Sequence, residues 1–117
     1  MIQILPSSKI NVATSPIDFR CGIDSLVGLC KWVLKSDPFS GAYFVFSNKN
    51  RRSIKILAYD GQGFWLFQKR FSQGKIAWWP KGDEGEKISP LDSRNFLLLL
   101  FNGDPNSAKF QNNWKNF

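Results

Sequence analysis

The residues best able to perform chemistry in this sequence are its carboxylates, because it contains no histidine. Without histidine, a Ser-His-Asp triad, a histidine metal site and a histidine proton shuttle are excluded. A cluster of acidic side chains could still bind a divalent cation, as in nucleases and transposases. The candidates outside the acidic stretch 81–87 are four aspartates: Asp18, Asp24, Asp37 and Asp60.

Local backbone structure offers a simpler explanation for most of these aspartates. Asp18 lies near a predicted helix start, Asp37 precedes a proline and Asp60 precedes a glycine. Aspartate in such places ordinarily accepts hydrogen bonds from nearby backbone amides. We therefore expect no catalytic residue, no metal site and no cofactor, and a protein that is not an enzyme. Convergence of at least two of these aspartates in space would instead indicate a small carboxylate nuclease.

Positive charge is concentrated in one part of the sequence. The chain has 16 Lys and Arg against nine Asp and Glu, a net charge of +7. Residues 47–81 hold eight of the basic residues and one acidic residue, Asp60. A basic surface that carries aromatic rings suits nucleic acid, because phosphates attract cations and bases stack on rings. The alternative is a solvated strand surface whose lysines protect a sheet edge from aggregation.

We predict that this basic segment binds DNA by neutralising phosphates. The predicted contacts are six cations: Arg51, Arg52, Lys55, Lys69, Arg70 and Lys75. Trp65, Trp78 or Trp79 could stack on bases if the side chain is exposed. The sequence contains no zinc finger, no RRM signature, no KH-type Gly-x-x-Gly loop and no evident helix-turn-helix, so the prediction concerns the phosphate backbone.

The elements that must position these residues follow from apolar spacing and turn signals. Apolar residues recur at helical intervals over 22–35, which predicts an amphipathic helix. Extended, apolar-rich segments predict strands at the following positions: 9–13, 42–46, 51–59, 63–71 and 75–79. A second helix is predicted to begin with Ser89 as N-cap and Pro90 in its first turn, and to continue through 96–101. The fold class is therefore α+β, an antiparallel meander of four to five strands packed with two main helices.

The central hairpin can be predicted in more detail. Asp60-Gly61 favours a two-residue turn, which pairs Tyr59 with Gln62 and Leu57 with Phe64. In that register Ile56 and its neighbours form an apolar face that packs against the helices. The other face, which contains Lys55, is predicted to be polar and basic at its open end, to carry aromatic residues toward the turn and to be open to nucleic acid.

The segment 96–101 is apolar on every side of its predicted helix. Such a helix lies either at the centre of the core or against a partner. We therefore predict a partner-binding surface, in a homodimer or with another protein, at Phe96, Leu99 and Leu100. Residues 1–103 are predicted to form a single domain, followed by an Asn-rich tail at 104–117.

The two cysteines and the N-terminus bear on the compartment. Cys21 and Cys30 match no zinc motif and are too few for a disulfide scaffold, so we expect reduced, partly buried thiols. The N-terminus lacks a basic signal-peptide region, and no apolar run reaches the length of a membrane span. These features predict a cytoplasmic protein without a membrane contact.

Several blocks, in order, resemble a known family. Residues 18–26 read DFRCGIDSL and resemble its D-x-R-x-G-x-D-x-L opening. Residues 37–46 are similar to DPFSG-x-x-FVF, and 55–64 to K-x-L-x-x-DGQGF. Residues 69–80 are similar to KR-x-x-x-G-K/R-x-x-WP. The family is the second-open-reading-frame product of insertion sequences of the insertion-sequence-66 type, often called TnpB, and Ser89-Pro90 resembles the start of its last helix.

The resemblance implies a bacterial mobile element that encodes a separate, larger transposase. The small protein would then be an accessory factor of transposition without catalytic activity of its own, and DNA and the transposase would be its partners. The alternative is a protein–protein adaptor that docks on the transposase without direct DNA binding. The family motifs carry no assignment of DNA-contacting residues, so the six predicted cations rest on charge alone.

Overall fold

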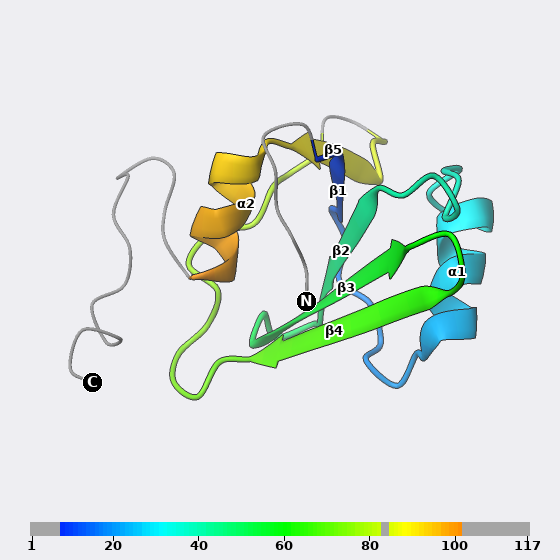
Figure 1. Ribbon diagram of the computed structural model, residues 1–117. Helices are drawn as coiled ribbons and strands as arrows, with labels where there is room; N and C mark the ends of the chain where they lie inside the picture. The colour runs from blue at the N-terminus through cyan, green and yellow to red at the C-terminus, as the bar shows by residue number, and fades with distance from the viewer. Residues whose placement is uncertain (1–7, 83–84, 102–117) are drawn as a thin grey trace.

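The computed structural model describes residues 8–82 and 85–101, which form one open sheet and two helices (Figure 1). The elements in chain order are β1 Ile10–Ala13, α1 Ile23–Trp32, β2 Tyr43–Ser47, β3 Ser53–Tyr59, β4 Phe64–Arg70, β5 Ile88–Leu91 and α2 Ser93–Leu100. The strands lie in the order β4-β3-β2-β1-β5, so β4 and β5 form the two edges. The predicted α+β class is confirmed. The predicted tail at 104–117 lies outside the described residues.

The two helices cover opposite faces of the sheet, as Figure 1 shows. On one face, Leu26 and Cys30 of α1 pack against Phe44, Phe46 and Leu57. The other face has its own core, in which α2 covers three of the strands. Its buried residues include Ile10, Val45, Ile54, Ile56, Phe96 and Leu99. The first six residues of β3 are therefore all buried, and the prediction of an exposed basic face on this strand is wrong.

The sheet is mixed rather than wholly antiparallel. β2, β3 and β4 form the predicted antiparallel meander. β1 pairs with β2 in parallel, with Ile10 opposite Tyr43, and the connection between them contains α1. A parallel neighbour requires such a crossover, because a tight turn reverses the chain direction. β1 also pairs antiparallel with β5.

The hairpin between β3 and β4 has a four-residue loop instead of the predicted two-residue turn. Tyr59 lies opposite Phe64, so the predicted pairing was wrong by two residues. The Asp60 carboxylate accepts hydrogen bonds from the backbone N–H groups of Gln62 (2.8 Å) and Gly63 (2.9 Å). Gly61 adopts a φ of 98°, which glycine tolerates without a Cβ clash. A shift of two residues keeps every side chain on the same face, so Ile56 still faces α2.

Two further predictions about secondary structure were wrong for reasons of packing. Residues 75–79 form no strand. Ile76 and Trp79 are instead buried in the core beneath α2. The Trp79 indole N–H donates to the Ala13 carbonyl at 2.9 Å. Residues Ser89 and Pro90 belong to β5, where an edge strand tolerates the missing proline N–H. Asp92 is the N-cap of α2 and accepts from the Asn95 N–H at 2.8 Å.

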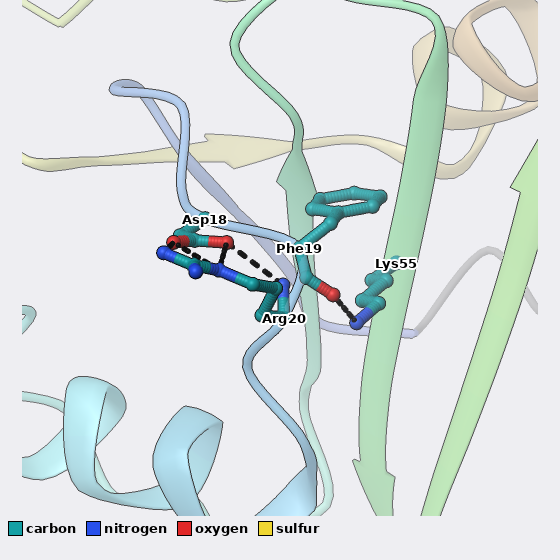
Figure 2. Close-up of polar contacts among 4 residues, drawn as sticks. All are labelled: Asp18, Phe19, Arg20 and Lys55. Atoms are coloured by element: carbon teal, nitrogen blue, oxygen red, sulfur yellow. Dashed lines mark hydrogen bonds and ion pairs between the residues drawn. The ribbon is translucent and has the colours of Figure 1, made fainter.

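A buried lysine joins β3 to the loop before α1. Lys55 is 5% exposed, and its ammonium donates to the carbonyl oxygens of Phe19 and Cys21, each at 2.8 Å. Figure 2 shows the Phe19 contact, and the same ammonium lies 4.9 Å from the centre of the Phe19 ring. A buried ammonium is costly unless such partners surround it. The contact therefore fixes the position of loop 17–21 over the sheet.

Both cysteines are free thiols, as predicted. Cys30 belongs to α1 and is fully buried against the sheet, and burial raises its pKa to about 12. Cys21 is partly exposed in the loop before α1. In the described part of the chain, neither helix is long and apolar enough to span a bilayer.

Replacing Lys55 by methionine tests the role of its ammonium. Lys55→Met keeps most of the side-chain volume but removes both hydrogen-bond donations, so it should lower the free energy of unfolding by about 1–3 kcal/mol. Urea denaturation followed by tryptophan fluorescence measures this change. Lys49→Met, at an exposed position of the next loop, is the control and should change stability by less than about 0.5 kcal/mol. Equal stability of the two variants would contradict the role assigned to Lys55.

The two thiols should react at different rates, because the thiolate is the reactive species. In the native protein at pH 8, Ellman's reagent should modify Cys21 and leave Cys30 unmodified, since Cys30 is buried and its pKa is raised to about 12. In denaturant both thiols should react. A Cys21→Ser variant that still releases one equivalent of thionitrobenzoate rapidly in native buffer would overturn this expectation.

Candidate nucleic-acid interface

The structure divides the six predicted DNA-contacting cations into three groups. Lys55 is buried and bonded to two carbonyls, so we remove it from the candidate contacts. Arg51 is partly buried and Lys69 is exposed, but both side chains hold other elements in place. Arg52, Arg70 and Lys75 are exposed.

Arg51 stabilises the end of β1 and the turn between β2 and β3. Its guanidinium donates to the hydroxyl of buried Ser47 and to the Thr14 carbonyl at 3.4 Å. The guanidinium also lies 4.7 Å from the centre of the Trp79 ring, within the range of a cation–π contact. Burial lowers the pKa of Arg51, although an arginine stays charged at neutral pH. Its backbone φ of 59° is the left-handed conformation that closes the turn.

Lys69 anchors the end of α2. Its ammonium donates to the Leu100 carbonyl at 2.5 Å, at the C-terminus of the helix, where the helix dipole favours a cation. The same ammonium lies about 5 Å from the ring centres of Phe71 (4.9 Å) and Phe101 (5.0 Å). Partial burial lowers the pKa of Lys69. The side chain therefore contributes positive charge to the surface, but its donors already serve the fold.

Four exposed cations lie at one end of the hairpin, which we name the basic end: Lys49, Arg52, Arg70 and Lys75. Arg70 is the last residue of β4 and lies opposite Ser53. The Phe71 N–H donates to the Arg52 carbonyl at 2.9 Å, and the Ile76 N–H donates to the Arg51 carbonyl at 2.7 Å. These bonds hold the turns 48–52 and 71–76 against each other. Lys49 was not among the predicted contacts, although the charge count of 47–81 includes it.

A hollow of about 700 Å³ adjoins the basic end. It lies between loop 16–19 and the turn 48–50, and both Asp18 and Lys49 line it. Arg20 donates to Asp18 through its guanidinium (2.6 Å, Nη2 to Oδ2) and through its backbone N–H (2.9 Å), as Figure 2 shows. The Arg20 hydrogen bond lowers the pKa of Asp18 to about 2. Asp18 thus stays ionised and paired with Arg20 in its own loop.

The four candidate carboxylates each have a local partner or position. Asp18 pairs with Arg20, Asp37 accepts from the Phe39 N–H at 2.9 Å, and Asp60 closes the hairpin loop. Asp24 lies in the first turn of α1, where negative charge is favourable. Within 8–82 and 85–101, no three His, Cys, Asp or Glu side chains gather where a metal ion could be held. The geometry of these aspartates therefore matches the local interpretation.

The three tryptophans predicted as possible stacking residues differ in exposure. Trp79 is buried against Arg51, and Trp78 is partly buried beside the same core. Trp65, on the edge strand β4, is 52% exposed. Among these three, Trp65 is therefore the residue whose ring is most open to a ligand.

The predicted partner surface on α2 needs correction. Phe96 and Leu99 are fully buried against the sheet, and Leu100 is partly buried in the same core. Their apolar character is therefore used inside the fold. The side chains that α2 and its C-cap expose are Leu97 (38%) and Phe101 (53%). Helical spacing alone did not separate the two sets, because every residue from 96 to 101 is apolar.

Comparison with known proteins identifies relatives of this chain. The family model described as IS66 Orf2 like protein matches residues 8–109. The chain is 38% identical over 91 residues to the uncharacterized protein y4hO of Sinorhizobium fredii (strain NBRC 101917 / NGR234), covering 74% of this chain and 78% of the relative. It is also 38% identical over 92 residues to the uncharacterized protein y4jC of the same strain, covering 79% and 76%. No solved structure matches the chain. The family match spans the whole sheet and both helices, and this chain therefore belongs to the IS66 Orf2 like protein family.

Proposed function

We propose that the protein is a non-enzymatic accessory factor of insertion-sequence transposition that binds DNA through its basic end. Membership of the IS66 Orf2 like family supports the transposition role. The observation that supports DNA binding is the clustering of Lys49, Arg52, Arg70 and Lys75 at the end of β4 and on the two adjoining turns. Asp60, the one acidic residue of 47–81, lies at the opposite end of the hairpin.

The mode of binding follows from the chemistry of these side chains. Two guanidinium groups can each donate two parallel hydrogen bonds to a phosphate, and two ammonium groups add point charges. Arg51 and Lys69 keep their structural contacts and add to the positive potential of the same region. The basic end lies on turns, so neither α1 nor α2 is offered to a major groove. Binding is therefore directed to the phosphate backbone and depends weakly on base sequence.

An adaptor role is the second candidate function. The observation that favours it is the exposure of apolar side chains on both helices, Trp32 (73%) on α1 and Leu97 and Phe101 at α2. In this alternative, these side chains dock on the transposase and the basic end is an incidental solvated surface. The two candidates differ in whether the purified protein binds DNA by itself.

Removing two cations from the basic end should reduce the salt dependence of DNA binding. For Arg52→Ala plus Arg70→Ala, the slope of log affinity against log salt should become less steep by about 1.8, because each lost phosphate contact removes about 0.9. Fluorescence anisotropy of a labelled duplex at several salt concentrations measures the slope. An element-end duplex and a scrambled duplex should give nearly the same affinity.

The matched control is Lys87→Ala plus Arg94→Ala, which also removes two positive charges from exposed positions, before β5 and on α2. It should leave the slope within about 0.3 of the original, because only direct phosphate contacts release counterions locally. Equal slope changes in the two double variants would contradict the assignment to the basic end. Absence of DNA binding by the unaltered protein at low salt would favour the adaptor.

A further inference from the structure

A second surface of the hairpin carries an exposed aromatic ring, that of Trp65, which is held in place by its neighbours. We propose that Trp65 and Phe67 form a stacking platform for the unpaired bases of single-stranded DNA. This inference rests on the proposed DNA binding and adds a substrate class to it. The ligand is a nucleotide whose base is free of a duplex partner.

The two rings are stacked on one side of β4, with nearly parallel planes. Their centres are 5.9 Å apart and their planes differ by 14°. They are two residues apart on a strand, so both side chains lie on the same face of the sheet. Trp65 is 52% exposed, whereas Phe67 is partly buried against the α2-side core. One ring is thus held by the core and the other extends the stack toward solvent.

The orientation of Trp65 is fixed before any ligand binds. Its indole N–H donates to the Asp60 carboxylate at 2.7 Å. That carboxylate is itself held by the backbone N–H groups of Gln62 (2.8 Å) and Gly63 (2.9 Å). An exposed tryptophan without such an anchor would lose rotational freedom on binding and weaken the complex. The anchor therefore makes Trp65 a preorganised stacking surface.

A hollow of about 270 Å³ lies beside this platform. Four aromatic side chains line it, those of Tyr43, Tyr59, Trp65 and Phe67. The Tyr59 hydroxyl donates to the Gly61 carbonyl at 3.2 Å, and both Asp60 oxygens already accept hydrogen bonds. The site therefore offers ring faces more than free polar groups, which suits stacking of any base and gives little sequence preference.

The charge of β4 favours a nucleic acid over an apolar protein segment as the occupant. The strand reads FWLFQKR and contains no acidic residue. The carboxylate of Asp60 lines the hollow, but both of its oxygens already accept hydrogen bonds from Trp65 and from backbone N–H groups. Trp65 and Arg70 are five residues apart, about 17 Å along an extended strand, and their side chains lie on opposite faces of the sheet at its outer edge. A single strand that follows this edge and crosses it once can therefore place phosphates at the basic end and a base on Trp65. β4 is an edge strand, so within residues 8–82 and 85–101 no further strand covers this path.

A duplex cannot use the platform in the same way. Its bases are stacked on each other, and their faces become available only after unpairing. The platform and the basic end should therefore make separable contributions. Trp65 should affect single-stranded DNA alone, whereas the cations should affect both forms.

The experiment compares Trp65→Ala with Trp32→Ala, a substitution of a still more exposed tryptophan on α1 (73% against 52%). Anisotropy titrations use a labelled oligothymidine and a strand of the same length in which abasic spacers replace the bases. Trp65→Ala should weaken oligothymidine binding about 5- to 150-fold, the range measured for loss of one stacking contact. It should leave duplex affinity and the salt slope unchanged, because no phosphate contact is lost. Trp65→Phe should recover part of the affinity.

The abasic strand provides the second readout. The unaltered protein should prefer oligothymidine to the abasic strand, and Trp65→Ala should lose that preference. Single-strand affinity that is unchanged in Trp65→Ala, or lost equally in Trp32→Ala, would overturn the platform and leave the DNA-binding proposal intact. Failure of the unaltered protein to bind either duplex or single strand would overturn both. Equal urea denaturation curves confirm that both variants are folded.

Discussion

The burial of one ammonium group determines much of this structure. β3 lies inside the sheet with helices over both faces, so a lysine at its centre must find hydrogen-bond acceptors in the protein. Lys55 finds them in the carbonyls of Phe19 and Cys21, which places loop 17–21 against the strand. That loop leads into α1, forms one wall of the hollow at the basic end and carries the Asp18–Arg20 pair. Lys55, which was predicted to contact DNA, instead positions the loop beside the candidate DNA-binding residues.

The covering of both faces also limits where a ligand can bind. A sheet with one open face presents alternate side chains of every strand, but here those side chains form two cores. In the part of the chain that the structure describes, the accessible regions are the outer edge of β4, the turns at the ends of the strands and the outward sides of the helices. The exposed cations lie on such turns, and Trp65 lies on such an edge. Both proposed contacts follow from this constraint.

The sequence predicted the parts of the fold that depend on local patterns. The first helix, the strands corresponding to β1–β4 and the reduced cysteines needed only apolar spacing and turn residues. The misassigned parts depend on distant partners. The acceptors of Lys55 are more than 30 residues away, and Trp79 bonds a carbonyl of β1. Pro90 follows a serine in a pattern typical of a helix start, yet it lies in β5, where Asn11 is its partner. No local rule distinguishes these outcomes.

The candidate site also combines features set by the local sequence with features set by distant partners. Charge counting located the basic segment around the hairpin, but it could not tell which cations make hydrogen bonds that hold the fold together. Lys69 bears on the alternative interpretation, in which the basic residues only protect the β4 edge from aggregation. An edge-protecting lysine must extend over the strand's free backbone groups, whereas the Lys69 ammonium turns to the C-terminus of α2. The same edge exposes Trp65, whose indole N–H is bonded to Asp60. An exposed aromatic ring favours association and does not protect the edge. Edge protection alone therefore explains neither the direction of the Lys69 side chain nor the exposure of Trp65. The proposed surface for a charged ligand that stacks on aromatic rings accounts for the exposure of Trp65.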